Sequence, residues 1–312
     1  MEEYVEGMDE LTKGIGLQGS LGRRGFIGAG LALAGTAALR PVSSALGSVA
    51  FEGTSATWLS HYTYVAPDLA ETRDWYHEVF GMQIGHQDAS EAHLWYGDQG
   101  GDTLMIVRQA GAGEDAPRIE RCGFVVDNWD TNAVGAELRR RGLSPRPDTD
   151  RGFWFDDPEG NEIGVFAKDF VTRPSAPPEQ PRLWNTLSAN HIVVTSRDYR
   201  KLGDWYLDLF ELRETMDTGR DVYQWFGDTV WIPTAVAEGD QTSFELKTVD
   251  HVAYTIADYD SAEVEAELRR RKLIEAEADV AGSLGINCVD INGFKTQICD
   301  KNLVPDAEGR RG

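Results

Sequence analysis

Short alternating strands and amphipathic helices follow one another along most of the chain in a fixed order. Each repeat of the order starts with an alternating strand, such as HIVVTS (191–196). A helix that begins at an Asp follows the strand; DYDSAEVEAELRRR (258–271) is an example from another repeat, and its Asp carboxylate caps the first turn. Three short strands separated by Gly and Asp turns come next, for example YQWFG (223–227) and DTVWIPT (228–234). This order occurs four times. We therefore predict an α+β fold of four βαβββ modules, with a helix on one face of each curved, mixed sheet.

The chain is an internal duplication with an offset of 130 residues. RDWYHEVFGM (73–82) corresponds to GDWYLDLFEL (203–212), and AELRRRGL (136–143) corresponds to AELRRRKL (266–273). Between the copies lies RPSAPPEQPR (173–182), whose prolines are typical of an extended linker. We predict two tandem domains, each with a cleft lined by strand residues. The predicted segments are a leader (1–50), a first domain (55–169), a linker (170–186), a second domain (187–303) and a tail (304–312).

The N-terminal segment has the features of an export signal. GRRGFIG (22–28), with Arg23 and Arg24, leads into a 14-residue apolar run (26–39) that is too short to span a bilayer comfortably, and the small residues SVA (48–50) offer a cleavage site. The segment resembles a twin-arginine signal. The resemblance implies recognition by the twin-arginine export machinery through Arg23 and Arg24, a periplasmic or otherwise extracytoplasmic location, and no stable membrane insertion after processing. A chance Arg pair before a lipid-seeking helix is the alternative.

Composition indicates a folded protein, argues against nucleic acid as a partner, and argues against a cysteine-based metal site. Hydrophobic residues make up 41% and aromatic residues 10% of the chain, which is typical of a folded protein. The formal net charge of −22 repels phosphates, so nucleic acid is not expected as a partner. Cys122, Cys288 and Cys299 form neither a disulfide framework nor a CxxC motif. A bridge between Cys288 and Cys299 across the last predicted hairpin is one reading; two buried free thiols is the other, and we favour it.

The first strands and the turns resemble those of a known superfamily. Together with the module order, the openings HIVV (191–194) and HVAY (251–254) and the turn DPEGN (157–161) are similar to the vicinal oxygen chelate superfamily, which includes glyoxalases, bleomycin-resistance proteins and dioxygenases. The likeness covers nearly everything after the leader. It implies a divalent ion in a cleft, held by residues of the first and last strands of the modules. The same scaffold also hosts lyases, isomerases, transferases and metal-free binders, so it does not fix the reaction.

The resemblance implies four first-strand and four last-strand ligand positions. On the first strands they are His61, Arg121, His191 and His251; counted four residues past each turn glycine, they are Met105, Gly164, Trp231 and Gln297 on the last strands. The first domain lacks a ligand set, because a guanidinium does not bind a cation and glycine has no side chain. We expect this domain to be structural or to bind an anion through Arg121, with Glu162 as the alternative ligand on the strand face of Gly164.

The second domain offers His191, His251 and Gln297, where the superfamily usually has two imidazoles and a carboxylate. We predict that these residues bind one divalent ion, Fe, Mn or Zn. Inherited histidines in an empty pocket are the alternative. A neutral amide leaves the ion about one charge unit more positive and more weakly held, which favours an anionic substrate such as an enediolate, catecholate or carboxylate. The remaining histidines match no ligand position and are expected on the surface: His77, His86 and His93.

A metal site confined to the second domain is similar to the two-domain extradiol ring-cleaving dioxygenases. Those enzymes carry a further His and Tyr before the final turn, whereas AGSLGINCVD (281–290) has no His and has Asn287 at the Tyr position. We therefore expect a metal-dependent enzyme, dioxygenase-, lyase- or isomerase-like, that acts on a small oxygen-rich molecule, and we assign no general acid or base. A metal-free protein that binds or sequesters a small molecule, as bleomycin-resistance proteins do, is the alternative. A structural or partner-binding protein is the third class.

Overall fold

The computed structural model describes most of the chain after the predicted leader. The described residues are 55–97, 102–170, 173–175, 182–227, 229–235, 249–274, 281–282 and 285–301. The predicted leader, the tail and part of the linker lie outside them, so the predicted domain boundaries stay predictions. All described residues belong to one compact unit, 51–312.

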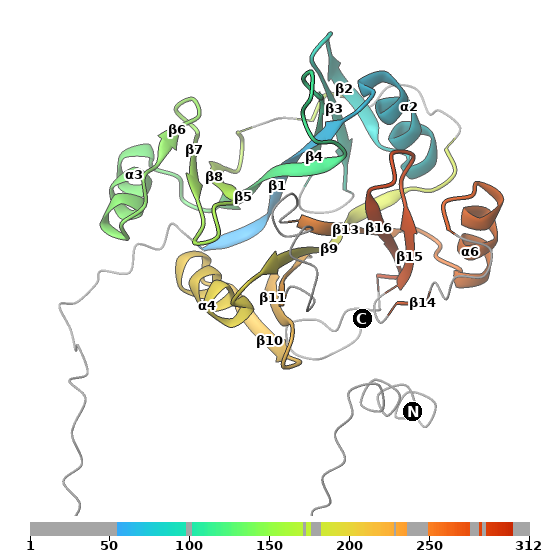
Figure 1. Cartoon of the computed structure of the whole chain (residues 1–312). Helices are drawn as coiled ribbons and strands as arrows, with labels where there is room; N and C mark the ends of the chain where they lie inside the picture. The colour runs from blue at the N-terminus through green and yellow to red at the C-terminus, as the bar shows by residue number, and fades with distance from the viewer. Residues whose placement is uncertain are drawn as a thin grey trace, which may run out of the picture. The chain divides into compact units, whose positions relative to one another are not determined.

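Two eight-stranded mixed sheets with the same strand order make up the fold (Figure 1). The first sheet has the order β2-β3-β4-β1-β5-β8-β7-β6, and the second has the order β10-β11-β12-β9-β13-β16-β15-β14. The strands of the first sheet are β1 (Ala56–Ala66), β2 (Gln83–Gln87), β3 (Glu91–Tyr96), β4 (Thr103–Gln109), β5 (Arg118–Val126), β6 (Arg146–Pro147), β7 (Gly152–Asp156) and β8 (Glu162–Ala167). Those of the second sheet are β9 (Thr186–Ser196), β10 (Arg213–Asp217), β11 (Val222–Phe226), β12 (Thr229–Ala235), β13 (Val249–Ile256), β14 (Ala281–Gly282), β15 (Gly285–Val289) and β16 (Lys295–Cys299).

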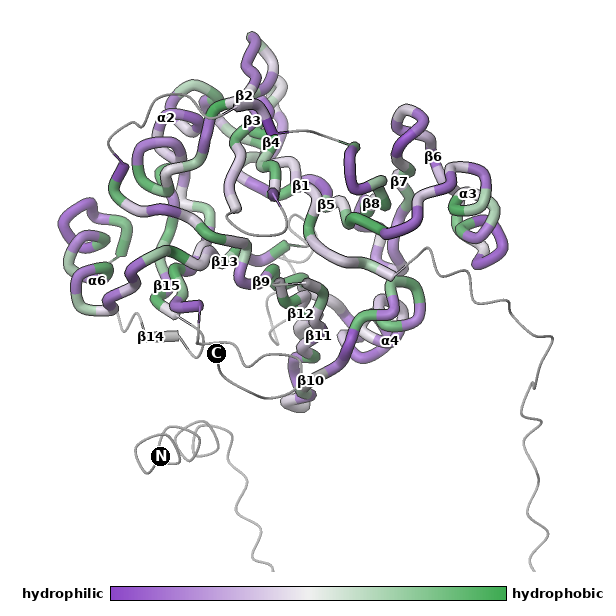
Figure 2. The backbone as a smooth tube through the Cα atoms, turned by 180° about the vertical axis from the view of Figure 1, so that it is seen from behind, coloured by the Kyte–Doolittle hydropathy of each residue, from purple (hydrophilic) through white to green (hydrophobic). Residues whose placement is uncertain are grey.

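One helix follows the first strand of every module. The helices are α2 (Leu69–Phe80), α3 (Thr131–Arg140), α4 (Tyr199–Phe210) and α6 (Ser261–Arg270). Each begins after an Asp whose side chain accepts a hydrogen bond from a backbone N–H of the first turn: Asp68, Asp130, Asp198 and Asp260. Figure 2 shows α3 and α6 changing between hydrophilic and hydrophobic colour along their turns, as amphipathic helices do. The prediction of an α+β fold with four βαβββ modules is confirmed.

The two sheets share one hydrophobic core. A single cluster of buried residues includes Tyr62 and Phe124 of the first sheet together with Trp231 and Tyr254 of the second. The hydroxyls of Tyr62 and Tyr254 lie 2.8 Å apart inside it. Because burying apolar area is the main source of folding free energy, the halves stabilise each other.

Two buried Asp side chains organise the β7–β8 and β15–β16 turns in the same way. Asp157 Oδ1 accepts hydrogen bonds from the backbone N–H groups of Glu159 and Asn161, both at 2.9 Å. Asp290 Oδ1 accepts them from Asn292 and Phe294, at 2.8 and 2.9 Å. The turns DPEGN (157–161) and DINGF (290–294) thus share one turn chemistry.

Tyrosines of the other half of the molecule reach both turn carboxylates. Tyr206 of α4 donates to Asp157 Oδ2 at 2.8 Å, and Tyr76 of α2 donates to Asp290 Oδ2 at 3.0 Å. Tyr64 of β1 donates a further bond to Asp290. Figure 1 shows the turn of the β7–β8 hairpin near α4 and the turn of the β15–β16 hairpin near α2. Burial raises the pKa of both carboxyls, and the hydrogen bonds act in the opposite direction.

All three cysteines are buried free thiols, as favoured from the sequence. Cys288 pairs with Thr296 in the β15–β16 ladder, and Thr296 lies three residues before Cys299 in the same strand. Side chains alternate between faces along a strand, so Cys288 and Cys299 point to opposite faces of the sheet. Among the described residues, no helix combines the length and the apolar character needed to cross a membrane.

Candidate functional site

A β-bulge directly precedes each of the four first-strand positions. In the β1–β5 and β9–β13 ladders the pairing skips Ser60, Glu120, Asn190 and Asp250, the residues before His61, Arg121, His191 and His251. A bulge adds one unpaired residue and changes the direction of the side chains beside it. Three of the skipped residues, Ser60, Asn190 and Asp250, hydrogen-bond the ring that follows them, a contact that regular strand alternation would not allow.

In the second sheet the bulges bring two imidazoles together at their Nε2 edges, with the ring planes 82° apart. His191 Nε2 and His251 Nε2 lie 3.2 Å apart. His191 Nδ1–H donates to Asn190 Oδ1 at 2.7 Å, and His251 Nδ1–H donates to Asp250 Oδ2 at 2.8 Å. With both Nδ1–H groups held by neighbours, the two Nε2 atoms are left to approach each other. A proton shared by the two nitrogens, or a cation bound by both, would relieve the repulsion between their lone pairs.

Gln297 completes the group from the neighbouring strand. It pairs with Ala253, which in turn pairs with His191 across β13 and β9. Its amide Nε2 donates to Asn287 Oδ1. Its Oε1 is buried and has no hydrogen-bond partner among the described residues. A buried amide oxygen without a partner is costly, so this atom is available to a ligand.

Burial sets the charge state of the site. The pKa of His191 lies well below its ordinary value because of burial first and the neighbouring His251 second, while the Gln297 amide acts in the opposite direction. His191 is therefore neutral near pH 7, as a metal ligand must be. Burial alone would raise the pKa of Asp250, but hydrogen bonds from His251 and Lys295 hold it at about 2.

The spacing of the two imidazole nitrogens matches that of two ligands of one divalent ion. Two imidazole nitrogens at about 2.1 Å from one ion, subtending roughly 100° at it, lie about 3.2 Å apart. The observed Nε2–Nε2 distance has this value. The described residues contain no group of three His, Cys, Asp or Glu placed to hold a metal. The candidate set therefore depends on the Gln297 amide as its third donor.

Aromatic rings fill the corresponding place in the first sheet. The His61 ring meets Trp154 and Phe166 edge-on, at centroid distances of 5.3 and 4.6 Å, and stacks on Phe170 at 5.5 Å. A Cβ atom at Gly164 would lie 2.4 Å from Phe166 and 2.7 Å from Trp154. Gly164 is thus required by the rings that occupy this place.

Protein groups also satisfy Arg121 and Glu162. The Arg121 guanidinium lies 4.5 Å from the Trp154 ring centroid, donates to Thr63, and approaches Glu162 at 3.6 Å. Glu162 accepts a further bond from Arg146 at 2.8 Å. These contacts favour a structural first sheet over the anion site expected at Arg121 or a metal ligand at Glu162.

Met105 and Trp231, counted from the sequence as ligand positions, lie in the core instead. Trp231 packs against Phe124 and Tyr206, with ring centroids 5.2 and 5.1 Å away. The register shows why counting was wrong. Gly164 pairs with the residue two positions after Arg121, and Gln297 pairs with the residue two positions after His251. The residues that pair two positions after His61 and His191 are Ile106 and Ile232, each one residue after the position that was counted. A shift of one residue reverses the face of a strand side chain.

The other histidines lie away from the second sheet's candidate site. His77 Nδ1 lies 2.7 Å from the carbonyl oxygen of Met82 and is half-buried. His86 and His93, on the β2–β3 hairpin, have ring centroids 5.1 Å apart, and His86 is exposed whereas His93 is half-buried. The expectation of surface positions holds fully only for His86.

Sequence reasoning missed Asn190 and Asp250. Both are polar residues directly before a histidine in a strand, a place where regular alternation directs the side chain to the opposite face. The only signal was the pair of dipeptides NH and DH, whose meaning depends on the bulges.

Comparisons with known proteins agree with this architecture. Residues 58–165 match the profile of the Glyoxalase/Bleomycin resistance protein/Dioxygenase superfamily. Similar solved structures include an extradiol ring-cleaving dioxygenase from B. fuscum (15% identity, 79% of this chain and 72% of that chain covered, TM-score 0.58). A Mn(II)-bound glyoxalase from Novosphingobium aromaticivorans is also similar (16%, 79% and 83%, TM-score 0.60), as is the 2,3-dioxygenase LapB from Pseudomonas sp. KL28 (13%, 79% and 93%, TM-score 0.59). No curated protein matches the chain. At these identities the likeness establishes the fold.

Proposed function

Residues 58–165 are a domain of the Glyoxalase/Bleomycin resistance protein/Dioxygenase superfamily, and from this premise we propose that the second sheet, which repeats the same fold, binds one divalent metal ion through His191, His251 and Gln297. The ion would serve a dioxygenase-, lyase- or isomerase-like reaction on a small oxygen-rich molecule. The observation that carries the proposal is the 3.2 Å approach of two Nε2 atoms whose Nδ1–H groups are both held by neighbours.

The donor set also suggests which substrates fit. A bound Fe, Mn or Zn ion supplies a Lewis acid that polarises a substrate oxygen. Because two imidazoles and an amide are all neutral ligands, an ion held by them would favour an anionic oxygen as a further ligand. His191 and Gln297 are nearly fully buried, whereas 17% of the His251 side chain is exposed.

An apolar wall lies beside the candidate ligands on the same sheet. Val193, Val230 and Ile232 form a separate buried cluster, against which Tyr223 and Trp225 pack. Val230 pairs with His191, and Val193 pairs with His251, so the cluster shares the ligands' face. We infer that this wall binds the apolar part of a substrate whose oxygen end is directed at the histidines.

Elemental analysis of the purified protein tests the metal site. We expect about one divalent ion per chain in the wild type and nearly none in the His251→Ala variant, because one imidazole of the set is lost. The Gln297→Glu variant should bind the ion more tightly, since a carboxylate adds a negative ligand. His86→Ala, at an exposed position, is the control and should keep the wild-type content. A wild-type content near zero would contradict the proposal.

A metal-free binding protein is the second candidate, and His61 favours it. That histidine stands at the register position of His191 but is packed among aromatic rings, so a first-strand histidine can serve packing alone. If the wild type contains no metal, and a small ligand raises its melting temperature equally with and without a chelator, this candidate replaces the first.

We also propose that the chain is exported by the twin-arginine route. The signal-like sequence at residues 22–28 lies outside the described residues, so the proposal rests on its Arg pair and short apolar run. Replacing Arg23 and Arg24 together by Lys should leave the precursor unprocessed inside the cell, because the route requires the arginine pair. Immunodetection in cell fractions measures this. Unchanged processing in the variant would refute the route.

A further inference from the structure

Among the described residues, Asp250 is the acidic residue that hydrogen-bonds a candidate ligand. Its two carboxylate oxygens have separate partners: His251 Nδ1–H donates to Oδ2, and Lys295 Nζ donates to Oδ1, each at 2.8 Å. Two bonds at different oxygens fix the plane of the carboxylate. The His251 ring is fixed in turn, because its Nδ1–H bond leaves Nε2 directed at His191 Nε2.

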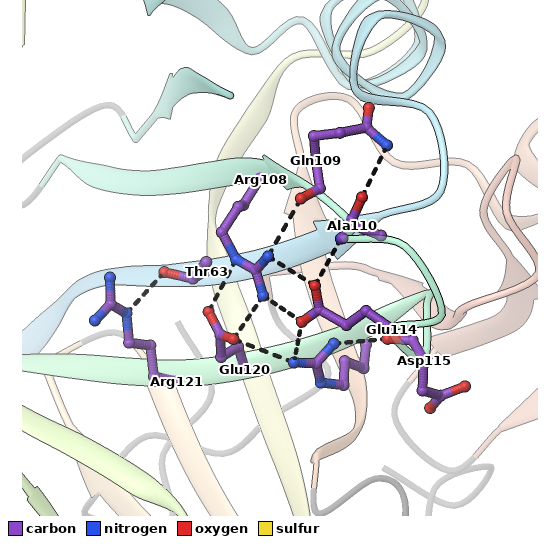
Figure 3. A network of polar contacts seen from close by, with 10 residues as sticks. Thr63, Arg108, Gln109, Ala110, Glu114, Asp115, Glu120 and Arg121 are labelled. Atoms are coloured by element: carbon purple, nitrogen blue, oxygen red, sulfur yellow. Dashed lines mark hydrogen bonds and ion pairs between the residues drawn. The ribbon is translucent and has the colours of Figure 1, made fainter. Parts of the chain in front are cut away.

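The other bulge residues show that this contact is specific to the fourth module. Ser60 and Asn190, the bulge residues before His61 and His191, hydrogen-bond the following ring through neutral groups. Glu120 is acidic, but it accepts bonds from Arg108 and Arg118 at 2.6 and 3.1 Å. Figure 3 shows Glu120 turned into this network of ion pairs and away from Arg121. Asp250 is thus the one bulge residue that brings a negative charge to an imidazole.

A dication among three neutral donors leaves its positive charge uncompensated in a partly buried place. A carboxylate hydrogen-bonded to the far nitrogen of a ligating imidazole makes that imidazole a stronger donor and lies close enough to offset the charge. Lys295 weakens the offset only in part, because 65% of its side chain is exposed whereas 28% of the Asp250 side chain is.

We propose that Asp250 is the positioning residue of the metal centre: it orients His251 Nε2 and supplies, one bond away from the ion, the negative charge that the Gln297 amide does not. This inference rests on the proposed function. Asp250 would hold the ring and supply the charge, and Gln297 would contribute a neutral donor to the ligand set.

Metal affinity measured with Zn²⁺ tests the inference. The apo protein is titrated with Zn²⁺ against a chromophoric chelator, and Co²⁺ absorption reports the coordination of the same site. The Asp250→Asn variant, which keeps an acceptor oxygen but loses the charge, should bind Zn²⁺ about 10- to 100-fold more weakly. In the double variant Asp250→Asn/Gln297→Glu, the new ligand carboxylate should restore affinity to near the wild-type value. Glu120→Gln is the matched control at the equivalent bulge and should leave Zn²⁺ affinity unchanged.

The outcomes separate this inference from the proposed function. If the wild type binds no Zn²⁺, both are overturned. If the wild type binds and Asp250→Asn binds equally well, only the role of Asp250 is overturned. If Asp250→Asn binds weakly but Gln297→Glu does not restore affinity, the charge argument fails. Near-wild-type circular dichroism of each apo variant ensures that a loss reflects the site and not unfolding.

Discussion

Gly164 and Gln297 occupy equivalent register positions in the two sheets, and their neighbours decide what each can do. Beside Gly164 stands Trp154, whose ring requires the absence of a side chain, whereas beside Gln297 stands Asn287, a smaller polar residue that binds the amide nitrogen. Volume excludes a ligand from one position, and a hydrogen bond orients a donor at the other. The same strand position is therefore structural in one sheet and available for chemistry in the other.

Buried histidines make stability depend on pH. Burial, with smaller contributions from Arg121 and His93, lowers the pKa of His61 to about 3 from an ordinary value of 6.5. Between these values the unfolded chain binds the proton and the folded chain does not. The stabilisation is therefore complete above pH 6.5 and decreases as the pH falls towards 3. The lowered pKa of His191 acts in the same direction.

Urea unfolding between pH 7 and pH 4 measures this effect. In the His61→Leu variant, the unfolding free energy should fall less steeply below pH 6.5 than in the wild type, by about 1.4 kcal/mol per pH unit. The His86→Gln variant, changed at an exposed position, should follow the wild type. Equal slopes for wild type and His61→Leu would show that His61 takes up its proton in the folded state.

At the scale of elements, bulges and turns place polar side chains where regular strands could not. The bulges at Asn190 and Asp250 bring each of these residues to the Nδ1 atom of the following histidine. The turns at Asp157 and Asp290 bury a carboxylate where a tyrosine of the other half can reach it. The bulges interrupt the strand pairing at one residue, and the turns are organised by one Asp. Both features occur in both sheets.

Removing one tyrosine hydroxyl tests the turn contacts. The Tyr206→Phe variant leaves Asp157 with one bond fewer, and we expect a loss of about 1–3 kcal/mol in unfolding free energy, because the lost bond is to a buried carboxyl. Tyr199→Phe, a half-buried position on the same helix, is the control and should change stability by less than about 0.5 kcal/mol. Chemical denaturation compares the two. An equal effect of both substitutions would rule out a stabilising role for this contact.

For the molecule as a whole, the duplication has produced two sheets with one topology and different interiors. They share a main core that contains Tyr62, Tyr254 and the ring cluster around Phe124. In the first sheet, aromatic side chains fill the face that corresponds to the candidate ligand face, which favours a role as a rigid support. The second sheet keeps two imidazoles and an unsatisfied amide oxygen on the same face. We expect the chemistry there.

The sequence by itself determined the order of elements, the fourfold module and the Asp caps of the helices, because these follow from periodicity and from contacts within a few residues. It also pointed to His191, His251 and Gln297, which the fold brings together, although their role as metal ligands stays a prediction. Only the tertiary structure decided which strand residues share a face, how Met105 and Trp231 enter the core, and where Asp250 points. Register, bulges and the filling of space depend on residues far apart in the chain, and no local pattern encodes them.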